Sequence, residues 1–444
     1  MLQVWLLSGE AVASIPVEEI CDVKDLKRRL HRLHGLPPRF RQRLLVDGKD
    51  VGDCVTLHSP MDLDLVLLNF PEESQSRADE LTAAASAGSP IEVESLLQLP
   101  QDPDDTDGDT PLGSASYHGR VEVARLLLEA GAKVDLEDAW GFTALRLASR
   151  FNHVEVVRLL LEAGAVPDSV DGDDCTALRL ATLQGHVEVA RLLLASGAED
   201  VANSRGDTAL MIASRTGDVE MVRLLLAAGF TMDLRNQDGH TALTYASWEG
   251  RVEVVRLLLM ARKDRDLAAS DDEVCGALRM AASNGYAEVA RLLLESGAEK
   301  DVANDEGRTA LVTASASGRV EVVRLLLEAG ANPDLADEDG CTALMIASSR
   351  CDLEVVRLLL DSGADKDIAD KGGRTALMKV FYLAEGNAHI SPPLLRTFKD
   401  SSQNYIFDLD IVPRLPGNPD HYRQAASFQR CLGVWCIRFS LPYI

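Results

Sequence analysis

The stretch from Thr143 to Gly164, TALRLASRFNHVEVVRLLLEAG, predicts two short helices joined by a turn. Thr143 is a residue type that caps the first turn of a helix, and Asn152 and His153 occupy the predicted turn. Gly164 follows the second helix, where a left-handed residue is needed to end it. Apolar residues cover more than one face of this second helix, over residues 154–163. Such a helix has to be buried between two neighbours, so one helix pair cannot fold alone.

The same pattern returns along most of the chain at a nearly constant interval. The tetrapeptide RLLL begins at Arg125, Arg158, Arg191, Arg223, Arg256, Arg291, Arg324 and Arg357. The interval is 33 residues except for one of 32 and one of 35, and a T-A-L tripeptide follows most copies. This period predicts a solenoid in which each unit contacts only its neighbours.

The opening T-P-L at residues 110–112 and the later T-A-L-x-x-A segments resemble the ankyrin-repeat family. The resemblance implies an all-α solenoid of helix pairs with hairpin-like finger loops. It also implies eight full repeats over residues 107–371, after a degenerate N-terminal capping repeat over residues 80–106. A partial repeat over residues 372–387 and an irregular tail, residues 388–444, would follow. The resemblance is specific for the fold and says little about the partner.

Two departures from the ankyrin pattern affect the loops. The family's histidine after T-P-L, which braces neighbouring loops, is absent from every unit, and this puts the rigidity of the loops in question. The residues in its place are Gly113, Arg146, Arg179, Met211, Thr244, Arg279, Val312, Met345 and Met378. In addition, the 35-residue interval has Arg262 where the helix-ending glycine is expected. We therefore expect an irregular junction over residues 260–275, and a weak point between two sub-arrays.

Residues 1–70 lack the repeat and predict a separate α+β domain, so the chain is multidomain. Alternating apolar residues over 2–6 predict a strand, and residues 12–17 can pair back on it as a hairpin. An amphipathic helix follows Asp22, and the segments RLLVDGKDV and LDLVLLNF predict two further strands. The order is strand, strand, helix, strand, strand. A linker over residues 71–79 would join this domain to the array.

The segment GLPPRFRQRLLVDGKDV, residues 35–51, is similar to a stretch of ubiquitin-like β-grasp domains. This resemblance implies that Leu45 and Val66 belong to the apolar patch through which such folds are recognised, with Lys49 at its edge. The arginines just before Leu45 would alter the preference for partners. Asn69 and the residues after it replace the terminal Gly-Gly that conjugation needs, so we expect an integral docking module. The alternative is a domain that has lost this recognition and only caps the protein.

Acidic residues dominate the charge, with 70 Asp and Glu against 45 Lys and Arg and a net charge of −25. This balance disfavours binding to nucleic acids and to anionic membranes, both of which need dense positive charge. Most of the excess lies just before the first full repeat and in the loops after the RLLL helices. These acidic loops either favour a protein partner with a basic surface or keep a repetitive array in solution.

Residues that differ between the repeats predict the partner-binding surface. In ankyrin repeats these are the finger tips and the residues before the turn between the helices, and here they include Trp, Tyr and Arg, which are enriched at binding hot spots. The predicted contact residues are Tyr117, His118, Trp140, Phe142, Arg150, Phe151, Arg215, His240, Trp248 and Glu249. The aromatic members from the first two full repeats would form the centre of the surface. The alternative is that they pack between adjacent fingers.

The sequence contains no phosphate-binding loop, no H-E-x-x-H and no G-x-S-x-G motif, and we expect no catalytic residue, no cofactor and no metal site. Its eight cysteines are too few and too scattered for a disulfide scaffold. No apolar run approaches the length of a membrane span, so no membrane insertion is expected, and the N-terminal stretch lacks the basic region of a secretory signal. An intracellular protein is expected, cytoplasmic or nuclear.

Together these features predict a non-enzymatic adaptor for protein–protein interaction. The ankyrin array would hold a client protein, and the ubiquitin-like domain would dock a ubiquitin receptor or a proteasome factor. The link between them would raise the effective concentration of one partner near the other. Two alternatives stay open: a general scaffold or signalling regulator with an inert β-grasp domain, and the regulatory part of an enzyme system whose catalytic part is another chain.

Overall fold

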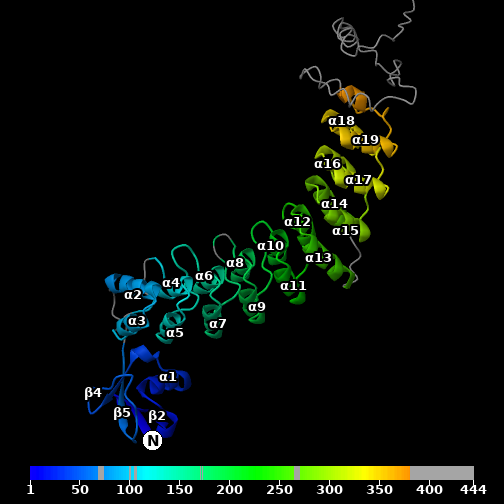
Figure 1. Ribbon diagram of the computed structural model, residues 1–444. Coiled ribbons are helices and arrows are strands. Elements are labelled where there is room, and N and C mark those ends of the chain that lie inside the picture. The colour runs from blue at the N-terminus through cyan, green and yellow to red at the C-terminus, as the bar shows by residue number, and fades with distance from the viewer. Residues whose placement is uncertain are drawn as a thin grey trace, which may run out of the picture. The chain divides into compact units, whose positions relative to one another are not determined.

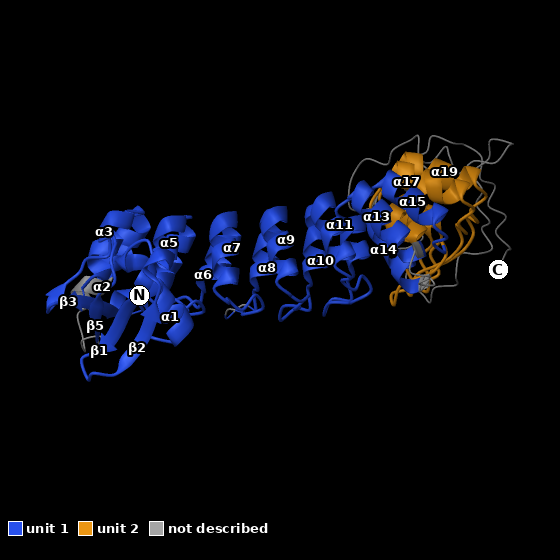
Figure 2. Ribbon diagram, turned by 90° about the horizontal axis from the view of Figure 1, so that it is seen from below, with its two compact units in different colours: residues 1–299 blue, residues 300–444 orange. Residues whose placement is uncertain are grey.

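The structure is a computed structural model, and it divides the chain into two compact units, residues 1–299 and residues 300–444 (Figure 2). The residues it describes are 1–68, 75–99, 102–104, 108–170, 172, 174–264 and 271–380. The first unit contains a mixed β-sheet and a series of helix pairs. The second unit contains further helix pairs of the same kind.

A five-stranded mixed sheet opens the first unit (Figure 1). Its strands are β1 (Leu2–Leu6), β2 (Ala11–Ile15), β3 (Gln42–Val46), β4 (Lys49–Asp50) and β5 (Asp62–Leu67). The order in the sheet is β2-β1-β5-β3-β4, with β1 and β5 parallel and the other neighbours antiparallel. Between β2 and β3 lies helix α1 (Val23–His34), flanked by two 3₁₀ turns, η1 (Val17–Glu19) and η2 (Arg39–Arg41).

Local sequence sets both ends of α1. The Asp22 carboxylate accepts a hydrogen bond from the Asp25 backbone N–H at 2.7 Å, and Gly35 ends the helix with φ +63°. The apolar face of α1 packs against one face of the sheet in a core that includes Val23, Leu26, Leu30, Leu44, Leu63 and Leu65. This arrangement confirms the prediction of a β-grasp-like fold.

Helix pairs make up the rest of the first unit. They are α2 (Gln75–Ala87), α3 (Pro90–Leu97), α4 (Pro111–Tyr117), α5 (Val121–Glu129), α6 (Ala144–Arg150), α7 (Val154–Glu162), α8 (Ala177–Gln184), α9 (Val187–Ala195), α10 (Ala209–Thr216), α11 (Val219–Ala227), α12 (Ala242–Trp248), α13 (Val252–Asp264), α14 (Asp271–Asn284) and α15 (Ala287–Glu295). The even-numbered helices pack side by side in one row, and the odd-numbered helices form a second row (Figure 1). The second unit continues the pattern with α16 (Ala310–Ala316), α17 (Val320–Glu328), α18 (Ala343–Ser349) and α19 (Leu353–Asp361).

The pair α6 and α7 shows why the repeat folds as it does. The Thr143 hydroxyl accepts a hydrogen bond from the Arg146 backbone N–H at the start of α6. Gly164 has φ +90° one residue beyond the C-cap of α7, a conformation that favours glycine. Buried residues of α7 contact both of its neighbours, since α7 packs against α5 and α9 as well as α6. The predicted array of ankyrin-type helix pairs is therefore confirmed.

Helix α2 begins at Gln75, inside the segment 71–79 that the sequence predicted as a linker. Alanine, glutamate and glutamine favour helix, and the sequence from Gln75 to Ala87 is rich in them.

Of the predicted partial repeat, residues 372–380 are described, and Thr375 pairs with Ala369 in an isolated β-bridge. Residues 381–387 and the predicted tail, 388–444, lie outside the described residues.

Short polar side chains hold the finger loops in place of the missing histidine. In each of six fingers an Asp or Asn side chain accepts hydrogen bonds from two backbone N–H groups two and four residues further on. These residues are Asp138, Asn203, Asn236, Asn304, Asp337 and Asp370. A second group of aspartates links successive repeats in five places by accepting a backbone N–H about 30 residues away. These are Asp104, Asp135, Asp168, Asp301 and Asp334. Part of the acidic character of the loops thus has a structural cause.

The unit with the 35-residue interval has the irregular junction that the sequence predicted, since α13 and α14 are both longer than the corresponding helices of the other repeats. Helix α13 continues through the expected glycine position to Asp264, because Arg262 and its neighbours are good helix formers. Arg262 and Glu273 are 5% and 3% exposed, and the Arg262 guanidinium donates to Glu273 and, at 2.9 Å, to Asp233. A buried ion pair therefore ties α13 to α14 at the predicted weak point. The chain divides into units at residues 299 and 300 instead.

Candidate functional site

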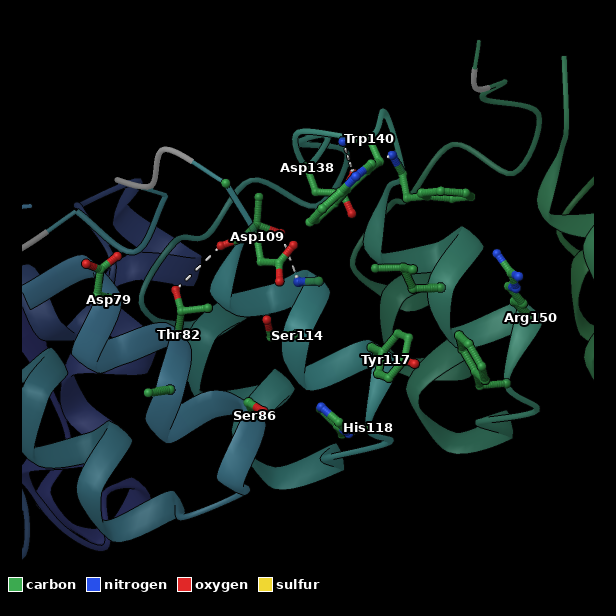
Figure 3. A pocket seen from close by; sticks show the side chains of 17 residues that line it. Asp79, Thr82, Ser86, Asp109, Ser114, Tyr117, His118, Asp138, Trp140 and Arg150 are labelled. Atoms are coloured by element: carbon green, nitrogen blue, oxygen red, sulfur yellow. Dashed lines mark hydrogen bonds between the residues drawn. The ribbon is translucent and has the colours of Figure 1, made fainter. Parts of the chain in front are cut away.

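A groove with a volume of about 700 Å³ crosses the inner helices α2, α4 and α6 (Figure 3). This volume lies within the range of ligand-binding pockets. Six of the ten predicted contact residues line it: Tyr117, His118, Trp140, Phe142, Arg150 and Phe151. The structure thus brings the aromatic residues of the first two full repeats together around one cavity.

Small residues on α4 create the groove. Ser114 stands four residues after the helix-capping threonine, and the same position holds Leu147 in α6 and Leu180 in α8, both almost completely buried. Those leucines fill the space between adjacent inner helices, whereas Ser114 leaves it open. Gly113 also lines the hollow and has no side chain to fill it; a Cβ there would come within 2.6 Å of Thr110 Oγ1.

Aromatic side chains form the wall of the groove on the α6 side. The rings of Tyr117 and Phe151 are 4.4 Å apart between centroids, and the Arg150 guanidinium lies 5.6 Å from the Phe151 ring. Trp140 is 68% exposed, which is exceptional for the largest apolar side chain in a protein. An exposed ring next to a cavity is available for contact with a partner.

Asp138 positions the two aromatic residues of the second finger. Its Oδ1 accepts hydrogen bonds from the backbone N–H groups of Trp140, at 3.0 Å, and Phe142, at 2.8 Å. Phe142 also has a structural contact, because its ring lies 5.8 Å from the guanidinium of Arg146, which is fully buried. Within this pair, Trp140 is therefore the residue with the smaller structural role.

Charge is distributed unevenly along the groove. Asp138 and Asp109 line the groove on the side of the finger loops, where Trp140 also lies, and Asp79 of α2 lines it across from them (Figure 3). The other end has His118 and Arg150, at the C-terminal ends of α4 and α6. The finger end is consequently acidic, whereas the opposite end carries the positive charge of Arg150.

The remaining predicted contact residues form a second cluster on α10, α12 and the finger between them. The His240 ring lies 5.6 Å from the Trp248 ring and 5.2 Å from the Tyr245 ring, and the Arg215 guanidinium lies 5.9 Å from Tyr245. Glu249 follows Trp248 as the C-cap of α12. Sequence reasoning missed Tyr245, which joins this cluster. Its hydroxyl contacts Asn236 and Asp207, and burial together with the nearby carboxylate raises the pKa of this phenol.

Leu45 and Val66 lie on the face of the sheet opposite α1, on adjacent strands. Both are half-buried, and Lys49 is exposed on the neighbouring strand β4. Trp5, which the sequence did not single out, pairs with Asp64 on this face, and Asp64 pairs with Leu45. The patch therefore has an aromatic neighbour and an acidic one.

Charged residues connect the β-grasp-like domain directly to the first repeats. Arg39 is 2% exposed and donates to Asp53 of its own domain at 2.6 Å, to Glu94 of α3 at 3.1 Å and to Glu129 of α5 at 2.9 Å. Arg28 of α1 also pairs with Glu129. These contacts come from α1 and from the residues before β3. They therefore do not cover the outer face of the sheet, on which Leu45 lies. Arg39 belongs to this interface and not to the predicted docking patch.

Within the described part of the chain, no group of three or more His, Cys, Asp or Glu residues is arranged to hold a metal ion. The six cysteines that the structure describes are unbonded thiols: Cys21, Cys54, Cys175, Cys275, Cys341 and Cys351. Cys431 and Cys436 lie outside the described residues. Among the described helices, none has both the length and the apolar character needed to cross a bilayer.

Comparison with protein families gives one clear result. The family model described as ankyrin repeats (3 copies) matches overlapping segments over residues 64–138, 81–171, 131–203, 178–271, 253–337, 278–370 and 329–388. These segments together cover well over half of the 444 residues. No curated protein matches the chain. With its helix pairs, threonine caps and finger loops, and with this match, the chain belongs to the ankyrin-repeat family.

Proposed function

We propose that the protein is a non-enzymatic adaptor that holds a client protein in the groove over α2, α4 and α6. Ankyrin repeats are protein-binding modules, and the observation that carries the proposal is the convergence of six variable residues on one cavity. Aromatic and arginine side chains of this kind dominate binding energies at protein interfaces. The hollow at Ser114 gives a client side chain a place to be buried.

The second part of the proposal concerns the β-grasp-like domain, which would dock a ubiquitin receptor or a proteasome factor. Leu45 and Val66 support it because they share the outer face of the sheet, away from the Arg39 contacts. Asp64 lies beside Leu45 and would add a negative charge to this otherwise apolar patch. The alternative, an inert cap on the array, is favoured by the burial of Arg39 between the two domains.

The groove is tested by Trp140→Ala in the full chain. Proteins captured by the wild-type chain should be lost by this variant and retained by Met260→Ala, which removes an exposed apolar side chain of α13 outside the predicted contact residues. Equal capture by the wild type and Trp140→Ala would refute client binding at this groove.

The docking patch is tested by Leu45→Glu in the full chain against Leu7→Glu, which changes an exposed leucine in the β1–β2 turn. We expect purified proteasomes or purified ubiquitin-binding domains to bind the wild type and Leu7→Glu but not Leu45→Glu. If none of these probes binds the wild type, the domain is an inert cap and the scaffold interpretation replaces the adaptor.

A further inference from the structure

We infer that the groove over α2, α4 and α6 accepts an extended, basic segment of a partner protein, with a lysine or arginine side chain placed at the finger end beside Trp140. The inference rests on the proposed function, because it names the chemistry of the client that this groove would hold. Three observations support it: the charge of the lining, the shape of the cavity and the exposure of the tryptophan ring.

The charge of the lining favours a cation at the finger end. Asp79 of α2, Asp109 just before α4 and Asp138 in the finger before α6 all line the groove, and Figure 3 shows Asp109 and Asp138 on the side where Trp140 lies, with Asp79 across the groove from them. Arg150 is the one arginine or lysine among the residues that line the cavity. Because these carboxylates line the groove with a single arginine to offset them, they favour a cation over an anion as the partner group. An acidic segment would meet repulsion at the same place.

The shape of the cavity favours an extended segment over a bulky surface. The groove runs across three inner helices, and its lining includes four small residues: Ala83 and Ser86 of α2 and Gly113 and Ser114 of α4. The next repeats have Leu147 and Leu180 at the position of Ser114, so the space closes beyond α6. The hollow is therefore local to the first repeats, and its small lining residues leave room for the side chains of an extended segment.

The exposed ring of Trp140 gives the cation a specific neighbour. Tryptophan has the aromatic face that attracts ammonium and guanidinium groups most strongly. Asp138 holds the backbone of Trp140 through its Oδ1, which keeps the indole at the acidic end of the cavity. The aliphatic part of a lysine or arginine side chain can lie along the indole while its charged group reaches the carboxylates.

The opposite end of the groove sets the direction of the segment. Arg150 lies over the Phe151 ring, and Phe151 packs against Tyr117, so this end combines aromatic surface with positive charge. A second cation there would be repelled, whereas an apolar residue would bury surface against the two rings. The expected client segment thus carries its basic residue at the finger end and an apolar residue at the Arg150 end.

The test selects random 12-residue peptides displayed on phage against the immobilised full chain and measures the affinity of synthetic versions by fluorescence anisotropy. We expect the selected peptides to contain lysine or arginine, and replacement of that residue by glutamine to weaken binding by about tenfold or more. Ser114→Leu, which fills the hollow with the residue of α6 and α8, should abolish binding. Thr313→Leu, the same position in α16, is its control and should bind as the wild type does.

Charge is tested by the triple variant Asp79→Asn, Asp109→Asn and Asp138→Asn. Asparagine occupies the position of Asp138 in three other fingers, so the loop should keep its fold. The control neutralises a distant finger through Asp337→Asn, Glu338→Gln and Asp339→Asn. We expect about tenfold weaker binding for the groove variant at 150 mM salt and a change below twofold for the control.

The outcomes separate this inference from the proposed function. Selected peptides that are neutral or acidic, but still depend on Ser114, would overturn the basic client and retain the groove as a binding site. Peptides whose binding ignores both Ser114→Leu and Trp140→Ala would overturn the groove and the basic client together. Circular dichroism melting of each variant verifies that a loss of binding does not come from unfolding.

Discussion

Arg39 donates a hydrogen bond from Nε to Oε2 of Glu129 at 2.9 Å, and this contact joins the β-grasp-like domain to the first full repeat. The guanidinium has two further acceptors, Asp53 and Glu94, and its side chain is 1% exposed. Pro38 lies against Gly131 in the same interface, where a Cβ would come within 2.7 Å of its ring. The β-grasp-like domain therefore contacts the first repeats mainly through charged side chains.

Arg39→Met should separate the two domains. The change leaves three carboxylates near one another without their shared cation, and breaking a buried ion pair of this kind costs about 3 kcal/mol or more. Glu94 and Glu129 are partly exposed, so the cost should lie at the low end of that range. Small-angle scattering should show a larger radius of gyration, and amide exchange in α3 and α5 should become faster.

Arg43→Met is the matched control for this change, because Arg43 pairs with Asp50 at 3.5 Å on an exposed part of the sheet. It should leave the radius of gyration unchanged. High salt should increase the radius of gyration of the wild type toward that of Arg39→Met, since salt screens partly exposed charges. An unchanged radius for Arg39→Met would show that the charged cluster does not hold the domains together.

Arg262→Ala should be among the most destabilising single changes in the first unit. Arg262 and Glu273 are buried together, and removal of one partner leaves an uncompensated charge at a cost of about 3–5 kcal/mol. Arg235→Ala is the control, because its pair with Asp272 is exposed and worth about 0–1 kcal/mol. Urea denaturation followed by circular dichroism measures both variants.

A double change tests whether the buried pair itself supplies the stability. Arg262→Met with Glu273→Leu replaces both charges by apolar side chains, and such replacements are often neutral or stabilising. We expect this variant to recover most of the loss seen for Arg262→Ala. If Arg262→Ala alone is as stable as Arg235→Ala, the junction between α13 and α14 does not depend on this pair.

The ends of the helices could be predicted from the sequence because their signals are local. Thr143 and Gly164 mark the ends of one helix pair, and both act within one turn of the residue concerned. The succession of strands and helix along the β-grasp-like domain followed in the same way from alternation and from the Asp22 cap, except that the segment predicted as one strand over RLLVDGKDV forms two, β3 and β4. The convergence of Tyr117 and Phe151 also follows, since residues 33 or 34 positions apart in an array lie on neighbouring helices.

Contacts between distant segments could not be predicted in this way. Glu129 and Glu162 occupy the same position, at the ends of α5 and α7, but of these two only Glu129 pairs with Arg39. The residue type therefore does not predict which glutamate contacts the β-grasp-like domain. Ser114 is different, because the column of Leu147 and Leu180 in the following repeats makes a serine there unusual. Only the packing shows that the missing volume remains open as a groove.

Trp140→Ala and Phe142→Ala should differ in their effect on stability. Trp140 is mostly exposed, so its removal should change the free energy of unfolding by about 0.5 kcal/mol or less. Phe142 covers the buried guanidinium of Arg146, whose nearest carboxylate oxygen, on Glu137, is 3.6 Å away. Loss of this ring should destabilise the protein by about 1–3 kcal/mol. Thermal melting of both variants measures the difference, and equal melting temperatures would contradict it.

Asp370 should make the last repeat of the second unit sensitive to acid. The carboxylate accepts a hydrogen bond from Lys379 Nζ at 2.9 Å, and it also accepts from the Arg374 side chain and backbone. Burial by itself would raise the pKa of Asp370, but these hydrogen bonds and charges hold it well below its usual 3.8. The pKa of Lys379 is raised in turn by the same carboxylate, although burial opposes this, so the pair stays charged through the neutral range.

The direction of the pH dependence follows from these shifts. Because the pKa of Asp370 is lower in the folded protein than in the unfolded chain, its stabilisation is fully present above about pH 4 and is lost as the pH falls below that value. Asp370→Asn keeps an acceptor for the backbone of the finger, as Asn304 does in another repeat, but it loses both ion pairs. This variant should lower the stability of the last repeat by about 1–3 kcal/mol at pH 7. Its stability should then fall less than that of the wild type between pH 4 and pH 2. Amide exchange over residues 376–380, corrected for the intrinsic effect of pH, measures both quantities. Parallel pH profiles for the wild type and Asp370→Asn would mean that another group controls the acid sensitivity of this repeat.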